Sequence, residues 1–320
     1  MPYMWMVLGS FAMASMGAIA HRLRDSCDWQ LIVLARVGLQ LLLAGLLAYL
    51  AGVPLVFRKP GILWVRSIAG SLAMVCMFYA YTRLPVAETF VLNNTFPIWV
   101  ALLSWPLLKQ PPTVAVWLAV VSATAGVFLM QQPRLDEGNF AALAALASSI
   151  FTAIAMIALN RLQGIDARAI IVHFSAVAVV ICVGSYLPAV LTRAAATTIP
   201  AAFADSAGQT DSAVLVAFLL LGVGVMALLA QLGITKAFTT GNAAKVSVVN
   251  LTQAVFAMIF DVFCFGRDID LVKFFGMTLI LASTAWLMIS AHASSQRTHS
   301  RKVIGGWFKN GSQKMSPTEG

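Results

Sequence analysis

The sequence has little charge: 10% of its 320 residues are Asp, Glu, Lys or Arg, whereas 60% are hydrophobic, and the mean hydropathy is +0.87. A soluble domain has about 25% charged residues, so this chain has too few solvating side chains to cover a surface that faces water. It also lacks a polar stretch long enough for a separate catalytic or nucleic-acid-binding domain, because the longest polar segments are residues 192–212 and the tail after Ala291. The composition therefore indicates an integral membrane protein.

Motifs of metallohydrolases, nucleotide-driven pumps and serine hydrolases are absent: the sequence contains no HExxH, no GxxxxGK[ST] and no GxSxG. Without a P-loop, any uphill transport must draw on an ion gradient, an exchange partner or the membrane potential. The four cysteines are far apart and form no CxxC pair, so neither a disulfide framework nor a metal site is expected. We also expect no cofactor. They are Cys27, Cys76, Cys182 and Cys264.

Apolar runs bounded by charge, Pro and Gly predict ten membrane-spanning helices in two sets of five. Residues 1–20 resemble a signal peptide but lack a basic residue before the apolar run, so we expect them to stay as the first span. The first set is expected at 3–20, 30–51, 62–82, 86–108 and 113–130, and the second at 139–160, 168–191, 213–237, 242–265 and 270–291.

An odd number of spans per set means that a duplication places the halves in opposite orientations, as in many secondary transporters. We therefore expect an all-α membrane protein with two inverted five-helix repeats, at 1–131 and 139–291, followed by a disordered basic cytoplasmic tail at 292–320. An ungapped offset of 156 residues pairs Asn94 with Asn250, but gives only four identities between 82–130 and 238–286.

The distribution of Lys and Arg bears on orientation. With a cytoplasmic N-terminus, thirteen of these residues fall inside and seven outside, which favours both termini in the cytoplasm of a bacterial inner membrane. Without the tail the count is eight against seven, and Arg22 with Arg24 directly after the first span favours the opposite orientation. The net charge of +9 is thus read as a topology signal and not as a nucleic-acid surface.

The stretch from Phe78 to Val100 carries a family resemblance. It begins FYAYTRLPVAE, with an aromatic-rich helix end, then Leu-Pro-x-Ala-acid, then a proline inside the next helix; Pro85, Glu88 and Pro97 fill these places. It resembles the third-to-fourth helix region of EamA-type members of the drug/metabolite transporter superfamily. Arg36 in Leu-Ala-Arg is similar to a recurring arginine of that family.

The resemblance implies ten helices around a central cavity and alternating access for a small organic metabolite, such as an amino acid, nucleotide derivative, vitamin or drug-like solute. It leaves open the substrate, the direction of transport and whether a proton or an exchanged solute is coupled. A homodimer also stays open. Many members end the fourth and ninth helices with Gly-Glu, whereas this chain has Lys109-Gln110 and Gly266-Arg267.

Candidate substrate-binding residues in the fourth helix share one face. At 100° per residue, Thr95 and Trp99 lie within about 20° of Glu88, so an acid, a hydroxyl and an indole form one stripe suited to a cationic or zwitterionic ligand. The structural alternative for Glu88 is stabilisation at a helix N-terminus. Asn94 is a further candidate on this helix because of its pairing with Asn250.

The remaining candidates are polar residues within other spans. Arg36 either faces a water-filled cavity or extends its side chain so that the guanidinium reaches the membrane interface. His173 either relays protons or is a packing residue held by hydrogen bonds. In the ninth helix, Asn250 and Gln253 either contact the ligand or join helices. The leading hypothesis is a secondary transporter; the alternative is a membrane-embedded transferase for a lipid-linked substrate, which would need clustered Asp or His.

The charge asymmetry gives a testable topology. Cys27 lies in the loop after the first span, so a membrane-impermeant thiol reagent should label it from the periplasmic side of intact spheroplasts, and a Cys27→Ser variant should lose that signal. Labelling only after the membrane is ruptured would mean that the orientation is inverted.

Overall fold

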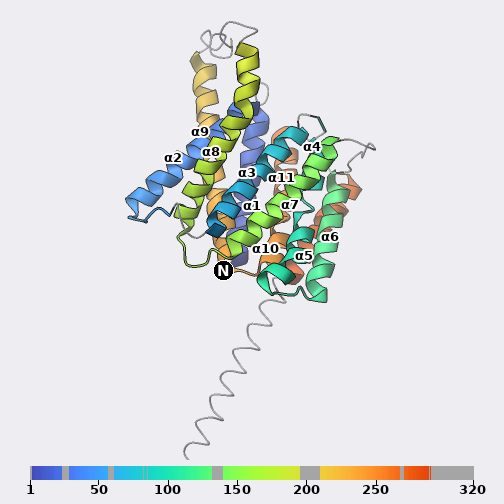
Figure 1. The fold of residues 1–320 in the computed structure, drawn as a ribbon. Coiled ribbons are helices and arrows are strands. Elements are labelled where there is room, and N and C mark those ends of the chain that lie inside the picture. The colour runs from blue at the N-terminus through green and yellow to red at the C-terminus, as the bar shows by residue number, and fades with distance from the viewer. Residues whose placement is uncertain are drawn as a thin grey trace, which may run out of the picture.

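The structure is a computed structural model, and it describes residues 2–23, 29–56, 61–81, 83–84, 86–131, 140–194, 210–266, 270–287 and 289. Every regular element in these ranges is a helix, and the helices form one elongated bundle (Figure 1). The predicted all-α class is therefore confirmed for the described part of the chain. The proposed tail at 292–320 lies outside it.

The helices follow the order of the predicted apolar runs. The first half contains α1 (Pro2–Leu23), α2 (Trp29–Leu50), α3 (Gly61–Tyr81), α4 (Val86–Asn93), α5 (Phe96–Leu108) and α6 (Val114–Gln131). The second half contains α7 (Phe140–Asn160), α8 (Ala167–Ala194), α9 (Thr210–Thr240), α10 (Ala243–Asn250), α11 (Thr252–Phe265) and a last helix, Leu271–Leu287.

Seven segments of the described residues are long and apolar enough to cross a membrane, and three shorter apolar helices accompany them. The three are Gly61–Met77, Val114–Met130 and Leu271–Leu287. All ten coincide with predicted spans. The lengths of α8 and α9 differ from the prediction, since both extend into the stretch expected to be a polar loop.

The fourth and ninth predicted helices are each broken, which the sequence patterns did not predict. A turn at Asn94–Thr95 separates α4 from α5, and Leu251 separates α10 from α11. Pro97 is therefore the second residue of α5 and not an interior residue of a continuous helix. This position tolerates proline because the first amides of a helix have no carbonyl to bond.

The two broken helices share one register. An offset of 157 residues superimposes the starts of α4 and α10, the ends of α5 and α11, and the starts of α6 and the last helix. Lys109 and Gly266, also 157 apart, both have left-handed backbone angles, with φ of 54° and 63°. In this register Asn93 is the equivalent of Asn250 in the other half, so the predicted pairing of Asn94 with Asn250 is wrong by one residue.

A second offset relates the first helices of the halves. α1 and α7 start 138 residues apart, and so do α2 and α8. In Figure 1, α4 lies above α5 whereas α10 lies below α11, so the broken helices run in opposite directions.

The halves pack into each other and not side by side. α1 packs on α9 and on α11, while α3 packs on α7 and α8. One apolar core cluster joins α5 and α6 to α10, α11 and the last helix, and a second joins α1, α3 and α5 to α7, α9 and α10. The interior is thus built almost wholly from contacts between the halves.

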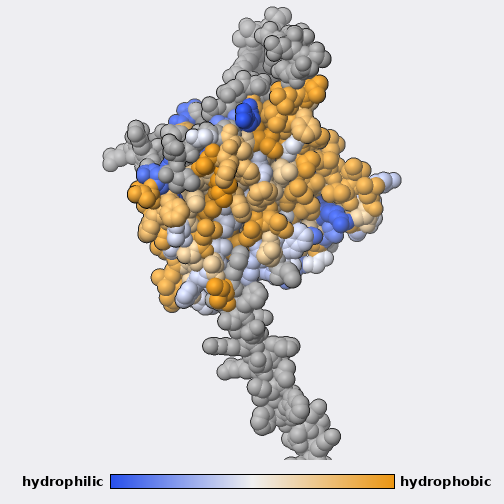
Figure 2. Space-filling model, turned by 180° about the vertical axis from the view of Figure 1, so that it is seen from behind, coloured by the Kyte–Doolittle hydropathy of each residue, from blue (hydrophilic) through white to orange (hydrophobic). Residues whose placement is uncertain are grey.

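The outside of the bundle is apolar. Figure 2 shows hydrophobic side chains over most of one face, with few hydrophilic groups among them. Large apolar residues are widely exposed, among them Leu42 on α2, Phe218 on α9 and Phe263 on α11. Such a surface fits lipid, since a water-soluble monomer rarely exposes large continuous apolar patches.

The contact between α1 and α9 depends on two glycines. A Cβ atom at Gly233 would lie 2.6 Å from the carbonyl oxygen of Trp5 and 2.8 Å from Cα of Gly9. A Cβ at Gly9 would lie 3.1 Å from the amide nitrogen of Ile234. The helix backbones therefore touch, as small residues allow in membrane proteins.

We predict that Gly233→Ala lowers the free energy of unfolding by about 1–3 kcal/mol, because the methyl group forces two backbones apart. The measurement is the thermal unfolding midpoint of the purified chain in detergent. Gly38→Ala is the matched control: nothing lies within 4 Å of a Cβ there, so the midpoint should stay or rise slightly. Equal midpoints for Gly233→Ala and Gly38→Ala would contradict the close contact.

Candidate functional site

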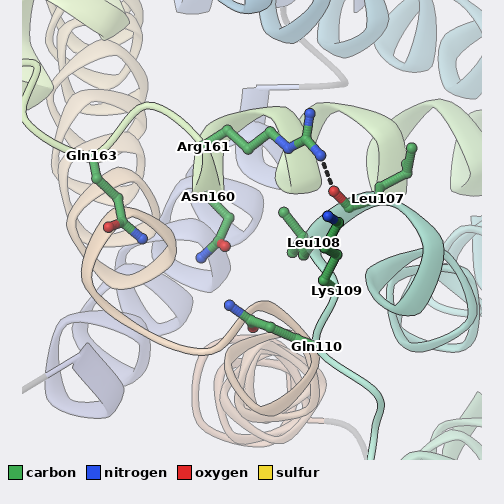
Figure 3. Close-up of a pocket in the computed structure, with 7 residues that line it drawn as sticks. All are labelled: Leu107, Leu108, Lys109, Gln110, Asn160, Arg161 and Gln163. Carbon is green, nitrogen blue, oxygen red and sulfur yellow. Dashed lines mark hydrogen bonds between the residues drawn. The ribbon is translucent and has the colours of Figure 1, made fainter.

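A pocket of about 360 Å³ opens at the end of the bundle where the N-terminus lies, which we call the N-terminal face. Figure 3 shows its lining, which comes from the end of α5 and the turn after it and from the end of α7 and the turn after it. The lining residues are Leu107, Leu108, Lys109, Gln110, Asn160, Arg161 and Gln163. Lys109 and Arg161 give this mouth positive charge.

Hydrogen bonds close the N-terminal face around this pocket. Asn160 Nδ2 donates to the carbonyl oxygens of Phe238 at 2.6 Å and Gly241 at 2.8 Å, and so joins the end of α7 to the end of α9. Asn242 Nδ2 donates to Gln110 Oε1 at 2.9 Å.

Two further contacts act at the same end of the bundle. The Asn242 side chain also caps α10, because its Oδ1 accepts from the amide of Lys245 at 3.1 Å. Arg161 Nη2 donates to the carbonyl oxygen of Leu107. The bonds of Asn242 with Gln110 and of Arg161 with Leu107 join the two halves at this face.

A second polar region lies where the broken helices pass α1 and α7. Ser148 Oγ donates to Asn93 Oδ1 at 3.0 Å, and Ser10 Oγ donates to the carbonyl oxygen of Asn250 at 3.4 Å. Ser10 and Ser148 are 138 residues apart, and Asn93 and Asn250 are 157 apart, so these contacts occupy equivalent positions in the two halves. Both serines are fully buried.

The predicted stripe on the fourth helix is altered by the break. Thr95 Oγ1 donates to the carbonyl oxygen of Leu92 at 2.7 Å and lies 3.2 Å from Ser149 Oγ on α7. Trp99 packs on the core cluster between α1, α3 and α7. The angle of 100° per residue does not carry from Glu88 across the turn at 94–95. The backbone of Glu88 lies in α4, and its side chain lies outside the described residues.

The amide candidates have different surroundings. Asn94 is buried, and its Nδ2 donates to the carbonyl oxygen of Phe90 at 2.7 Å, one turn earlier. Asn250 ends α10, and its Oδ1 is buried without a hydrogen-bond partner among the described residues. Gln253 is half-buried at the second position of α11. The side-chain oxygen of Asn250 can therefore still accept a hydrogen bond.

Arg36 and His173 lie away from the broken helices. Arg36 on α2 is half-buried, and its Nη2 lies 3.9 Å from the sulfur of Met13 on α1. His173 on α8 is buried, with its Nδ1 2.7 Å from Ser67 Oγ on α3 and the Trp64 ring edge-on at 4.7 Å. The eight candidates therefore fall into two groups: those on the fourth and ninth helices, and those on α2 and α8.

Sequence patterns missed Arg66. It was counted with the cytoplasmic segments, yet it lies inside α3, is 2% exposed and donates from Nη2 to Gln231 Oε1 of α9 at 3.3 Å. The available signal was its position: Arg66 is the sixth residue of α3 and Arg36 the eighth of α2, so both stand inside apolar helices.

Comparisons with known proteins agree with the fold and the resemblance. Residues 1–131 match the EamA-like transporter family. The pseudopaline exporter of Pseudomonas aeruginosa is 28% identical over 252 residues, which are 78% of this chain and 82% of that protein. An uncharacterized transporter of Helicobacter pylori is 24% identical over 229 residues, 71% of this chain and 72% of that protein.

A human relative and a solved structure extend the comparison. Solute carrier family 35 member G1 of Homo sapiens is 24% identical over 236 residues, 67% of this chain and 60% of that protein. One crystal structure superimposes with a TM-score of 0.72 at 16% identity, covering 90% of this chain and 97% of that one. That likeness concerns the fold alone. The predicted resemblance to EamA-type proteins is confirmed.

The hydrogen bonds at the N-terminal face give a prediction. Asn160→Ala should lower the free energy of unfolding by about 1–3 kcal/mol, because it leaves the buried carbonyl group of Phe238 and the half-buried one of Gly241 without their donor. The thermal unfolding midpoint in detergent measures the loss. Gln163→Ala, at an exposed position of the same pocket, serves as the control and should unfold with the wild type. An Asn160→Ala variant as stable as this control would show that the amide does not hold the face closed.

Proposed function

We propose that this chain, whose residues 1–131 match the EamA-like transporter family, is an EamA-type member of the drug/metabolite transporter superfamily and a secondary transporter that moves a small organic solute by alternating access. Its ten apolar helices would span a bacterial inner membrane as two inverted five-helix repeats. The observation that carries the proposal is the pair of broken helices, α4–α5 and α10–α11, in one register and running in opposite directions.

Broken helices suit a solute-binding site. Each break exposes helix ends and polar side chains inside the bundle, where transporters of this general design bind substrate near the bilayer midplane. Paired amides grip a polar solute without the cost of a buried charge. The proposed contacts on these helices are Glu88, Asn94, Thr95, Trp99, Asn250 and Gln253. Arg36 and His173 would contact the solute or a coupled proton from α2 and α8.

The closed N-terminal face supports alternating access. The bonds of Asn242 with Gln110 and of Arg161 with Leu107 join opposite halves. If the halves rock against each other, these bonds are the ones that must separate when the solute leaves or enters on this side. Each of these hydrogen bonds contributes only about 1 kcal/mol net, so together they are weak enough to break when the two halves move apart at this face.

Charge at the same face supports a cytoplasmic N-terminus. Lys109 and Arg161 line the pocket, and Lys236 lies 4.2 Å above the Trp5 ring near the start of α1. Positively charged residues concentrate on the cytoplasmic side of bacterial membrane proteins. The energy source would be a proton gradient or an exchanged solute, and a homodimer is compatible with the apolar outer surface.

The full-length chain in liposomes tests the proposal. With no ATP present, at least one solute of a panel containing amino acids, nucleotide derivatives, vitamins and pseudopaline should cross faster than in protein-free liposomes, under an imposed pH gradient or by exchange. Pseudopaline is included because a relative is described as its exporter. A correctly folded chain that moves no panel solute faster than the protein-free liposomes would contradict the proposal.

Variants in the same assay test the binding residues. Asn250→Leu should weaken the apparent affinity for the transported solute, because a buried carbonyl oxygen with open bonding capacity is lost, while the unfolding midpoint stays near that of the wild type. Glu88→Gln should reduce transport more than protein level, and Gln163→Leu should leave transport unchanged. An Asn250→Leu chain with normal affinity and a lowered midpoint would make this amide a structural residue.

A further inference from the structure

Arg66 is a buried charge in the interior of the bundle. Among the described residues, it is the one Arg, Lys, Asp or Glu that is classed as buried, with 2% of its surface exposed. A charged side chain within a membrane span is costly, so such residues usually face a partner of opposite charge or a wet cavity.

The direction of the side chain excludes snorkelling. Arg66 is the sixth residue of α3, so an arginine reaching for water would turn back toward the start of the helix. Instead, Nη1 lies only 2.4 Å from where a Cβ atom of Gly70 would be, one turn deeper. Glycine at position 70 leaves the room that the guanidinium fills.

Phe174 and Gln231 hold the guanidinium in place. Its Cζ lies 4.3 Å from the centroid of the Phe174 ring on α8, and Nη2 donates to Gln231 Oε1 on α9. A stacked guanidinium is fixed in its plane before a ligand arrives. The group is therefore preorganised by side chains of the opposite half.

No described residue neutralises the charge of Arg66. Its Nε is buried without a hydrogen-bond partner, and no carboxylate of the described residues forms an ion pair with it. Gln231 supplies a neutral oxygen. A planar guanidinium with an open N–H edge matches the two oxygens of a carboxylate or phosphate.

Other polar groups lie on the same helices. Ser67, the residue after Arg66, meets His173 beside Phe174, and Thr235 one turn after Gln231 has a buried hydroxyl without a hydrogen-bond partner. The polar groups come from α3 in one half and from α8 and α9 in the other. A ligand at Arg66 would thus contact both halves.

We propose that Arg66 is the recognition site for an anionic group, a carboxylate or a phosphate, on the transported solute. The inference rests on the proposed transport function and names the class of solute. In the solute-free state, Gln231 occupies one donor of the guanidinium, and the anion takes the open edge at Nε when it binds.

The test uses the purified full-length chain and matched solutes that differ in the ionised group. The pairs are alanine with alaninamide, succinate with dimethyl succinate, and glycerol 3-phosphate with glycerol. Thermal stabilisation of the chain is titrated against each solute. We expect a member that carries the carboxylate or phosphate to stabilise the wild type and its counterpart without that group not to; the pair that responds distinguishes carboxylate from phosphate.

Variants assign the effect to Arg66. Arg66→Gln should weaken binding of the stabilising anion roughly ten- to a hundredfold, since a hydrogen bond to a charged group is lost. Arg66→Lys should retain part of the affinity, and Arg168→Gln, at the start of α8, should retain all of it. Equal binding of members with and without the carboxylate or phosphate, unchanged affinity in Arg66→Gln, or no stabilising member that carries such a group would each overturn the proposal.

A ligand-independent measurement separates a binding role from a structural one. Arg66→Met should unfold at the wild-type midpoint or above it, because a buried charge without a counter-ion is replaced by an apolar side chain of similar length. A clearly lowered midpoint would overturn the proposal. Flux of neutral solutes that survives in Arg66→Gln would leave the transport function standing, whereas absence of any flux in the wild type would contradict that function itself.

Discussion

One constraint acts on the whole structure: every backbone N–H and C=O group within the hydrocarbon core of a bilayer must find a hydrogen-bond partner in the protein, because no water is there to bond it. A helix satisfies this requirement alone, so a break within the bilayer needs partners from elsewhere. At the two breaks, the hydroxyls of Thr95 and Thr252 bond the carbonyl groups three residues earlier. Ser10 of the opposite half donates to the backbone carbonyl oxygen of Asn250 at the end of α10, and Ser148 donates to the side-chain oxygen of Asn93 at the end of α4. The irregular segments can exist because the other half covers them.

The same dependence explains why the halves are intertwined. Each half buries its broken helix mainly against the first helix of the other half: α1 packs on α10 and α11, and α7 packs on α4 and α5. Motion of one half relative to the other therefore changes the surroundings of both breaks at once. The polar groups around Arg66 obey the same geometry, since α3 supplies the charge and α8 and α9 supply the ring and the amide that orient it.

Hydropathy predicted the order and number of apolar helices because each span must be apolar along its whole length, which one sequence records directly. The breaks were missed because the angular pattern from Glu88 to Trp99 assumes a continuous helix, whereas a turn at Asn94–Thr95 interrupts it two residues before Pro97. The one-residue error in pairing Asn94 with Asn250 has the same origin: identities are sparse, and helix boundaries fix the register. Arg66 was read as an interfacial residue because its turn toward Gly70 depends on space made by other helices.

The contact of Gly9 with Gly233 has a consequence for biosynthesis. The two glycines are 224 residues apart, so at about 5–20 residues per second the ribosome needs roughly 11–45 seconds after making one to make the other. During that interval α1 sits in the membrane with the groove at Gly9 and the hydroxyl of Ser10 uncovered. The surface of α1 around Gly9 is therefore synthesised well before α9, the helix that covers it in the folded chain.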